Sequence, residues 1–152
     1  MRKTIAEFIK EDEYLIHCDM FDTEKFPTKA LTIDCLLGES NAINVASGLA
    51  STGSNVYLYG VAGFIIHRYE QLKFSARNFG SKKGKIIIFN AGRIGYGGLG
   101  DGHKLADDLE IMDILNISKY CPNDKVELID ILNSIETQYN EGIFYIQLGS
   151  DY

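Results

Sequence analysis

Residues 85–92, KIIIFNAG, place four apolar residues in succession between a Gly/Lys turn and a glycine-rich segment. A continuous apolar run of this length is typical of a strand that is buried on both faces. Such strands occur in parallel sheets that helices cover on both sides. We therefore expect the chain to form a layered α/β domain around this strand.

Strand-like and helix-like segments alternate along the rest of the chain. Strands are predicted at 14–18, 31–37, 56–61, 117–121 and 143–148, and helices at 2–11, 40–51, 65–78, 105–115 and 124–139. Helical connections imply parallel neighbours, because a parallel strand pair needs a crossover. The prediction is a three-layer αβα sandwich with a mainly parallel central sheet. Since no linker or internal repeat is visible, we expect one domain over residues 1–152.

Charge and cysteine content restrict the partners and the compartment. The net charge is -6, and the one lysine cluster, at 82–85, is expected to be a solvated loop, so we expect no nucleic-acid partner. The three cysteines are odd in number and lack C-x-x-C spacing, which predicts buried free thiols and a cytoplasmic location. No apolar run approaches the ~20 residues that span a bilayer, so we expect no membrane partner.

A glycine-rich loop follows the buried strand and is predicted to bring backbone close to a ligand. A dinucleotide G-x-G-x-x-G at 95–100 is disfavoured, because it lies in mid-chain and no helix begins at once. A P-loop needs Gly-Lys-Ser/Thr, and that is absent. The loop ends on His103, and its six glycines are Gly92, Gly95, Gly97, Gly98, Gly100 and Gly102.

The segment 38–53, GESNAINVASGLASTG, puts Glu39 at the start of a helix of small residues. Taken alone, Glu39 has two interpretations. It could be a surface acid before an N-cap at Ser40, where the helix dipole favours negative charge. It could also be a buried carboxyl with a chemical role, since such burial is costly. A carboxyl walled by Leu36 and Leu37 would be shielded from water and suited to sharing a proton.

Five segments, in the same order along the chain, match motifs of one enzyme family. They are LLGESNAINVASGLA with Glu39 nine residues before Gly48, YGVAGFIIHRYEQ with Phe64, GGLGDGHK with His103, LNISKYCPNDKVE with Asp124, and IFYIQL. On these residues the chain resembles the pyrimidine-binding (Pyr) domain of transketolase-like thiamine-diphosphate enzymes over residues 14–148. The resemblance implies the Pyr type of the thiamine-diphosphate-binding fold in a stand-alone chain.

The resemblance also implies residue roles. Glu39 would be catalytic and cofactor-binding, by hydrogen bonding to N1′ of the aminopyrimidine so that the cofactor can lose its thiazolium proton. Phe64 would stack on the pyrimidine, with ordinary core packing as its alternative. His67 would lie on the cofactor side. Either His67 or Arg68 could fill a substrate-binding position, and His103 would contact substrate as a catalytic residue.

The implied enzyme makes or breaks a C–C bond next to the carbonyl of a ketose or 2-oxo acid, as a transferase of carbohydrate metabolism. Leu99 and Gln147 stand where the family has an acid and an arginine, so the donor sugar does not follow. No diphosphate-binding (PP) domain is evident in the chain, which contributes no metal ligands. We therefore expect thiamine diphosphate to be shared with a separate PP-domain subunit that holds Mg²⁺.

The expected assembly is a heterotetramer that contains a homodimer of this chain, and the chain is expected to be inactive alone. Two alternatives stay open. One is a β-type subunit of a 2-oxo-acid decarboxylase or dehydrogenase. The other is a non-catalytic Pyr-like scaffold or regulatory module.

Overall fold

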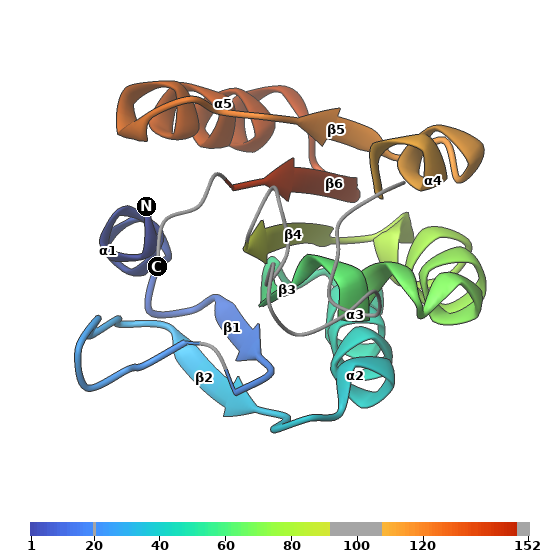
Figure 1. Ribbon diagram of the computed structural model, residues 1–152, viewed down its shortest axis with the longest axis horizontal. Helices are drawn as coiled ribbons and strands as arrows, with labels where there is room; N and C mark the ends of the chain where they lie inside the picture. The colour runs from blue at the N-terminus through green and yellow to red at the C-terminus, as the bar shows by residue number, and fades with distance from the viewer. Residues whose placement is uncertain (20, 92–107, 149–152) are drawn as a thin grey trace.

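The computed structural model describes residues 1–19, 21–91 and 108–148, apart from the side chains of residues 61 and 62. Its strands form one sheet in the order β2-β1-β3-β4-β6-β5 (Figure 1), and every neighbouring pair is parallel. This confirms the predicted parallel α/β sheet. The strands are β1 (Tyr14–His17), β2 (Leu31–Asp34), β3 (Val56–Val61), β4 (Lys85–Ala91), β5 (Ser118–Tyr120) and β6 (Gly142–Gln147).

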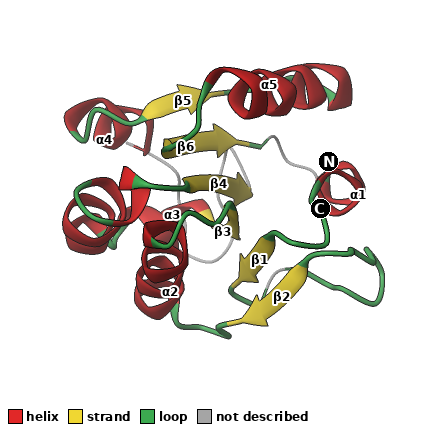
Figure 2. Cartoon of the chain, turned by 180° about the vertical axis from the view of Figure 1, so that it is seen from behind, coloured by secondary structure: helices red, strands yellow, loops and turns green. Residues whose placement is uncertain are grey.

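Helices cover both faces of the sheet, as Figure 2 shows from behind. One face carries α2 (Glu39–Ser51), α3 (Ala62–Ile66), the π-helical segment η1 (Gln71–Arg77), the short 3-10 turn η2 (Gly80–Lys82) and α4 (Asp108–Ile114). The other face carries α1 (Arg2–Phe8) and α5 (Lys125–Gln138). The described residues therefore form three layers, as predicted.

The core lies on both sides of β4, whose seven residues are all buried. Ile86 and Ile88 pack with α2, α3 and α4, whereas Ile87 and Phe89 pack with α1 and α5. This division follows from the strand period, because successive side chains point to opposite faces. Burial on both faces explains why this strand carries an unbroken apolar run.

Two elements differ from their predicted extents. The strand predicted at 31–37 ends at Asp34, because the Asp34 carboxylate oxygen Oδ1 accepts a hydrogen bond from the Leu36 amide (2.8 Å) and Leu36 takes a positive φ of 51°. The helix predicted at 65–78 is instead α3 followed by the π-helical η1. A π-helix shifts the hydrogen-bonding partner by one residue, which periodicity alone does not reveal.

The three cysteines are free thiols of unequal exposure. Cys18 is buried, Cys35 is partly exposed and Cys121 is exposed. The prediction that all three are buried is therefore wrong for Cys121, which lies just beyond the short edge strand β5. Among the described helices, none combines the length and the apolar character that crossing a bilayer requires.

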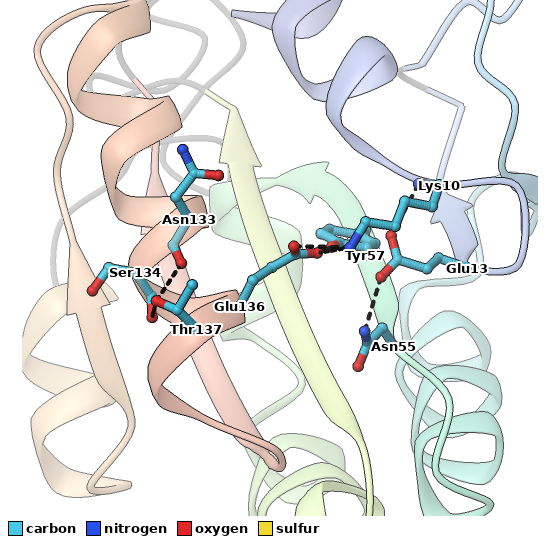
Figure 3. A network of polar contacts seen from close by, with 8 residues as sticks. All are labelled: Lys10, Glu13, Asn55, Tyr57, Asn133, Ser134, Glu136 and Thr137. Carbon is cyan, nitrogen blue, oxygen red and sulfur yellow. Dashed lines mark hydrogen bonds and ion pairs between the residues drawn. The ribbon is translucent and has the colours of Figure 1, made fainter.

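Figure 3 shows a polar network at the amino-terminal edge of the sheet, where it ties the segment between α1 and β1 to α5 and to β3. Lys10 Nζ donates to both Glu136 oxygens at 2.9 Å, and the Tyr57 hydroxyl donates to Glu136 Oε1 at 3.4 Å. Glu13 accepts from the Asn55 side chain and from the Lys10 backbone amide. Because these groups satisfy one another, this network holds the layers together.

Candidate functional site

The carboxyl-terminal ends of the parallel strands meet at one edge of the sheet, the edge at which α/β folds bind ligands. His17 ends β1, Asp34 ends β2 and Gln147 ends β6, while Asn90 is the penultimate residue of β4. Glu39 begins α2 shortly after β2. These polar residues are far apart in the sequence, but they lie at the same edge of the sheet.

Glu39 is buried, with 6% of its surface exposed, at the first position of α2. Gly38 is the N-cap residue, so the helix begins two residues earlier than a Ser40 cap would place it. The alternative of a surface acid is wrong. Among the described residues, none donates a hydrogen bond to the Glu39 carboxylate. The carboxylate oxygens can therefore accept hydrogen bonds from a ligand.

The expected wall of leucines around Glu39 is wrong. Leu36 is 64% exposed and Leu37 is 78% exposed. The turn that ends β2 causes this, because the Gly38 amide donates to the Cys35 carbonyl (3.0 Å) and the two leucines stand outside the core. The burial of Glu39 comes instead from the tertiary fold around the start of α2.

Cys18 follows β1 and lies near the Glu39 carboxylate, and Cys35 follows β2 and lies near Cys18. Burial raises the pKa of the Cys18 thiol to about 12, and the nearby charges of Glu39, Cys35 and Asp34 add to the shift. The pKa of Cys35 is also raised, first by burial and then by Asp34. Both thiols are therefore protonated at neutral pH. Cys18 therefore supplies a neutral, weakly polar neighbour to the acid.

Phe64 lies in α3, which follows the carboxyl end of β3 directly. Its side chain is partly buried, and α3 contacts α2. Glu39 and Phe64 therefore belong to two neighbouring helices of the same face of the sheet. The roles expected of Glu39 and Phe64 stay predictions.

His67 and Arg68 follow the last residue of α3 and differ in their surroundings. His67 is exposed, whereas Arg68 is partly buried. The Arg68 Nε atom is buried and has no hydrogen-bond partner among the described residues. A guanidinium with an unused N–H is suited to an anionic group. Which of the two residues fills the substrate-binding position stays a prediction.

His103 and the glycine-rich loop around it lie outside the described residues. Their predicted substrate role stays a prediction. The described part of the predicted site therefore consists of Glu39, Phe64, His67 and Arg68, carried by α2, by α3 and by the residues just after α3.

Sequence reasoning missed a buried polar cluster centred on Asp108, the first residue of α4. Asp108 Oδ2 accepts hydrogen bonds from Gln147 Nε2 (2.7 Å), the Tyr145 hydroxyl (2.8 Å) and Asn90 Nδ2 (3.4 Å). Burial, and then the Asp108 charge, raises the pKa of Tyr145 well above its ordinary value. The Gln147 side chain is held in this cluster by its hydrogen bond to Asp108. Gln147 stands at the position where transketolase-like enzymes have an arginine. Asn90 and Gln147 at the ends of buried strands were its only signal in the sequence.

Known proteins resemble this chain in structure and not in sequence. No protein-family model and no curated protein matches the sequence. A thiamin diphosphate-dependent enzyme from Mycobacterium smegmatis superposes with a TM-score of 0.74 at 12% identity, over 97% of this chain and 30% of that enzyme. Transketolase from Campylobacter jejuni superposes with a TM-score of 0.71 at 12% identity, over 95% of this chain and 24% of that enzyme.

These likenesses show the fold. The chain has the α/β fold of a domain found in thiamine-diphosphate-dependent enzymes, including a transketolase. It spans less than a third of the length of either enzyme.

Proposed function

We propose that this chain is the pyrimidine-binding component of a transketolase-like thiamine-diphosphate enzyme. The reaction makes or breaks a C–C bond next to the carbonyl of a ketose or 2-oxo acid. The observation that carries the proposal is the buried Glu39 carboxyl at the start of α2, at the carboxyl edge of an all-parallel sheet. The likeness in fold to two thiamine-diphosphate enzymes supports it.

The described residues fit the pyrimidine half of the cofactor. Glu39 is buried without a hydrogen-bond donor among the described residues, so it can share a proton with a ring nitrogen. Phe64 on the neighbouring α3 offers an aromatic ring to the same ligand. When bound, thiamine diphosphate supplies the electron sink that carbanion chemistry beside a carbonyl needs.

Arg68 and His103 are proposed to act on the substrate, and His67 on the cofactor side. The buried, unpartnered Nε of Arg68 supports an anionic group on the substrate. The two residues therefore differ in what their substitution changes. Loss of the Glu39 carboxyl is expected to affect the cofactor, whereas loss of the Arg68 guanidinium is expected to affect substrate affinity. A fall in apparent substrate affinity with little change in cofactor affinity is therefore expected for Arg68→Gln.

The diphosphate and Mg²⁺ are proposed to be held by a separate PP-domain subunit, in a heterotetramer built on a homodimer of this chain. One observation supports a partner at this edge. Leu36 and Leu37 are exposed in the turn that leads to Glu39, where an apolar partner surface would cover them.

The test is capture of the tagged chain from its native lysate, followed by identification of co-purifying chains by mass spectrometry. We expect a partner that carries G-D-G followed by N-N. The reconstituted complex is then assayed for carboligation with 2-oxo acid and ketose donors. Glu39→Gln is expected to lower the rate by about 10²–10⁴-fold while assembly persists, because it removes the proton-sharing carboxyl.

Glu7→Gln is the matched control, since Glu7 is an exposed acid of α1 that forms an i,i+4 ion pair with Lys3. It is expected to leave both rate and assembly unchanged. A Glu39→Gln complex that keeps the full rate would refute the catalytic assignment. A chain that is captured without a partner and binds no thiamine diphosphate with Mg²⁺ would refute the proposed function, and only the likeness in fold would stand.

A further inference from the structure

A pocket of about 370 Å³ lies at the ends of β1 and β2, and none of its lining residues is used in the proposed chemistry. Its aromatic residue, Phe21, packs with α1 and α5, whereas Glu39 and Cys18 belong to the side of the sheet that carries α2. Its volume is at the lower end of the ~300–1,000 Å³ typical of small-molecule sites. The lining residues are Arg2, His17, Asp19, Phe21, Asp22 and Asp34.

The charge of this pocket is negative overall. Three carboxylates, those of Asp19, Asp22 and Asp34, line it together with one guanidinium. Burial lowers the pKa of His17, against the smaller opposing effects of Asp34 and Asp19, so the imidazole is neutral at pH 7 and adds no positive charge. A ligand that carries a cationic group is therefore favoured.

His17 supplies a polar atom that the fold leaves unused. Its side chain is 6% exposed, and its buried Nδ1 has no hydrogen-bond partner among the described residues. Nδ1 lies 3.5 Å from Asp34 Oδ1 without a hydrogen bond between them. In the neutral tautomer that carries its proton on Nε2, Nδ1 is a hydrogen-bond acceptor. Two acceptors then face the same space, and one N–H donor could serve both.

Arg2 provides the opposite charge in a defined position. Its Nε donates to the Tyr59 hydroxyl at 2.8 Å, and its guanidinium carbon lies 5.7 Å from the centre of the Tyr59 ring. These two contacts hold the guanidinium at the pocket. A planar guanidinium matches the two oxygens of a carboxylate. The pocket therefore offers complementary sites for both ends of a small zwitterion.

We propose that this pocket binds a free α-amino acid. Its ammonium group would lie between Asp34 and His17 Nδ1, and its carboxylate would face Arg2. Asp19 and Asp22 strengthen the attraction for the ammonium group, and the Phe21 ring borders the space left for the side chain. The site stands on its own residues, so it holds whether or not the chain binds thiamine diphosphate.

The test is a ¹H–¹⁵N NMR titration of the whole chain with each standard L-amino acid at pH 7. At least one is expected to cause saturable shifts at residues 17–22 and 34. Ethylamine and acetate serve as probes that carry one charge each, and each is expected to bind at least about tenfold more weakly than the best amino acid. No saturable shift with any amino acid at about 10 mM would overturn the proposal. So would equal affinity for ethylamine.

Asp34→Asn tests the ammonium site without disturbing the turn, because the asparagine oxygen can still accept from the Leu36 amide. It is expected to weaken binding by about tenfold or more, and Arg2→Gln likewise. Asp130→Asn, at an exposed position of α5, is expected to change affinity less than about twofold. The unliganded spectrum of each variant shows whether the fold is kept. Unchanged affinity in a folded Asp34→Asn variant would refute the assignment.

Discussion

His17 shows how one residue responds to its place in the fold. It is the last residue of the apolar strand β1. The structure buries it beside Asp34 and Asp19, and burial lowers its pKa below the ordinary 6.5. Because this pKa is lower in the folded chain than in the unfolded chain, the free energy of unfolding is higher above pH 6.5, where His17 is neutral in both states. This contribution is lost as the pH falls below 6.5, because the unfolded chain takes up the proton first.

The corresponding measurement is the NMR titration of the His17 ring protons in the folded chain. We expect a midpoint below 6.5. In Asp34→Asn the midpoint should fall further, because the Asp34 charge favours the protonated ring. A midpoint at or above 6.5 would contradict the burial argument, and an upward shift in the variant would contradict the sign of the Asp34 effect.

The two buried carboxyls of the candidate site differ in how visible they are in the sequence. Glu39 could be singled out because a recognisable run of small residues follows it. Asp108 could not, because its donors Tyr145, Gln147 and Asn90 come from β4 and β6. Hydrogen bonds between strands and a helix depend on the tertiary fold, which the local sequence around Asp108 does not encode.

At the scale of elements, α5 illustrates a helix whose ends are readable in the sequence. Asp124 is its N-cap and accepts hydrogen bonds from the amides of Val126 (2.8 Å) and Glu127 (2.9 Å). The Glu127 carboxylate accepts in turn from the Asn123 amide at 2.6 Å. These reciprocal contacts satisfy amides that a helix start leaves open. The helix therefore begins where the segment after Pro122 predicts.

Asp124→Ala is expected to lower the free energy of unfolding by about 0.5–2 kcal/mol, because the capping oxygen is removed. Asp130→Ala, an exposed change within the same helix, should cost less than about 0.5 kcal/mol. Urea denaturation followed by circular dichroism measures both. Equal losses in the two variants would show that the cap contributes nothing beyond the loss of one surface charge.

At the scale of the whole molecule, Gly84 marks where four segments come into close contact. A Cβ at this position would lie 2.2 Å from the Ser54 carbonyl oxygen and 2.7 Å from the Ala50 carbonyl oxygen. Its own carbonyl accepts from the Gly142 amide at 3.1 Å. The end of α2, the turn before β3 and the starts of β4 and β6 therefore meet at a residue without a side chain.

Gly84→Ala is expected to lower the free energy of unfolding by about 1–3 kcal/mol or more, since backbone on two segments must move. Gly48→Ala is the matched control. A Cβ at Gly48, in the middle of α2, meets nothing within 4 Å. That variant should therefore gain about 0.5–1 kcal/mol. Denaturation midpoints that move in the same direction for both variants would contradict the close approach at Gly84.

By itself, the sequence determined the layers of this protein. Apolar runs such as 85–92 specified buried strands, helical spacing specified the crossovers, and the Pro122–Asp124 signal specified the start of α5. These features are local, because strand and helix periods and capping contacts act within a few residues. The fold class and the parallel sheet followed from them.

Only the tertiary structure decided the surroundings of the polar groups. It exposed Leu36 and Leu37, buried Glu39 near Cys18, which follows β1, and joined Asp108 to two strands. It also left His17 and Arg68 with unpartnered nitrogens among the described residues. The physical reason is that burial and hydrogen bonding depend on neighbours in space, which in a parallel sheet come from segments far apart in the chain.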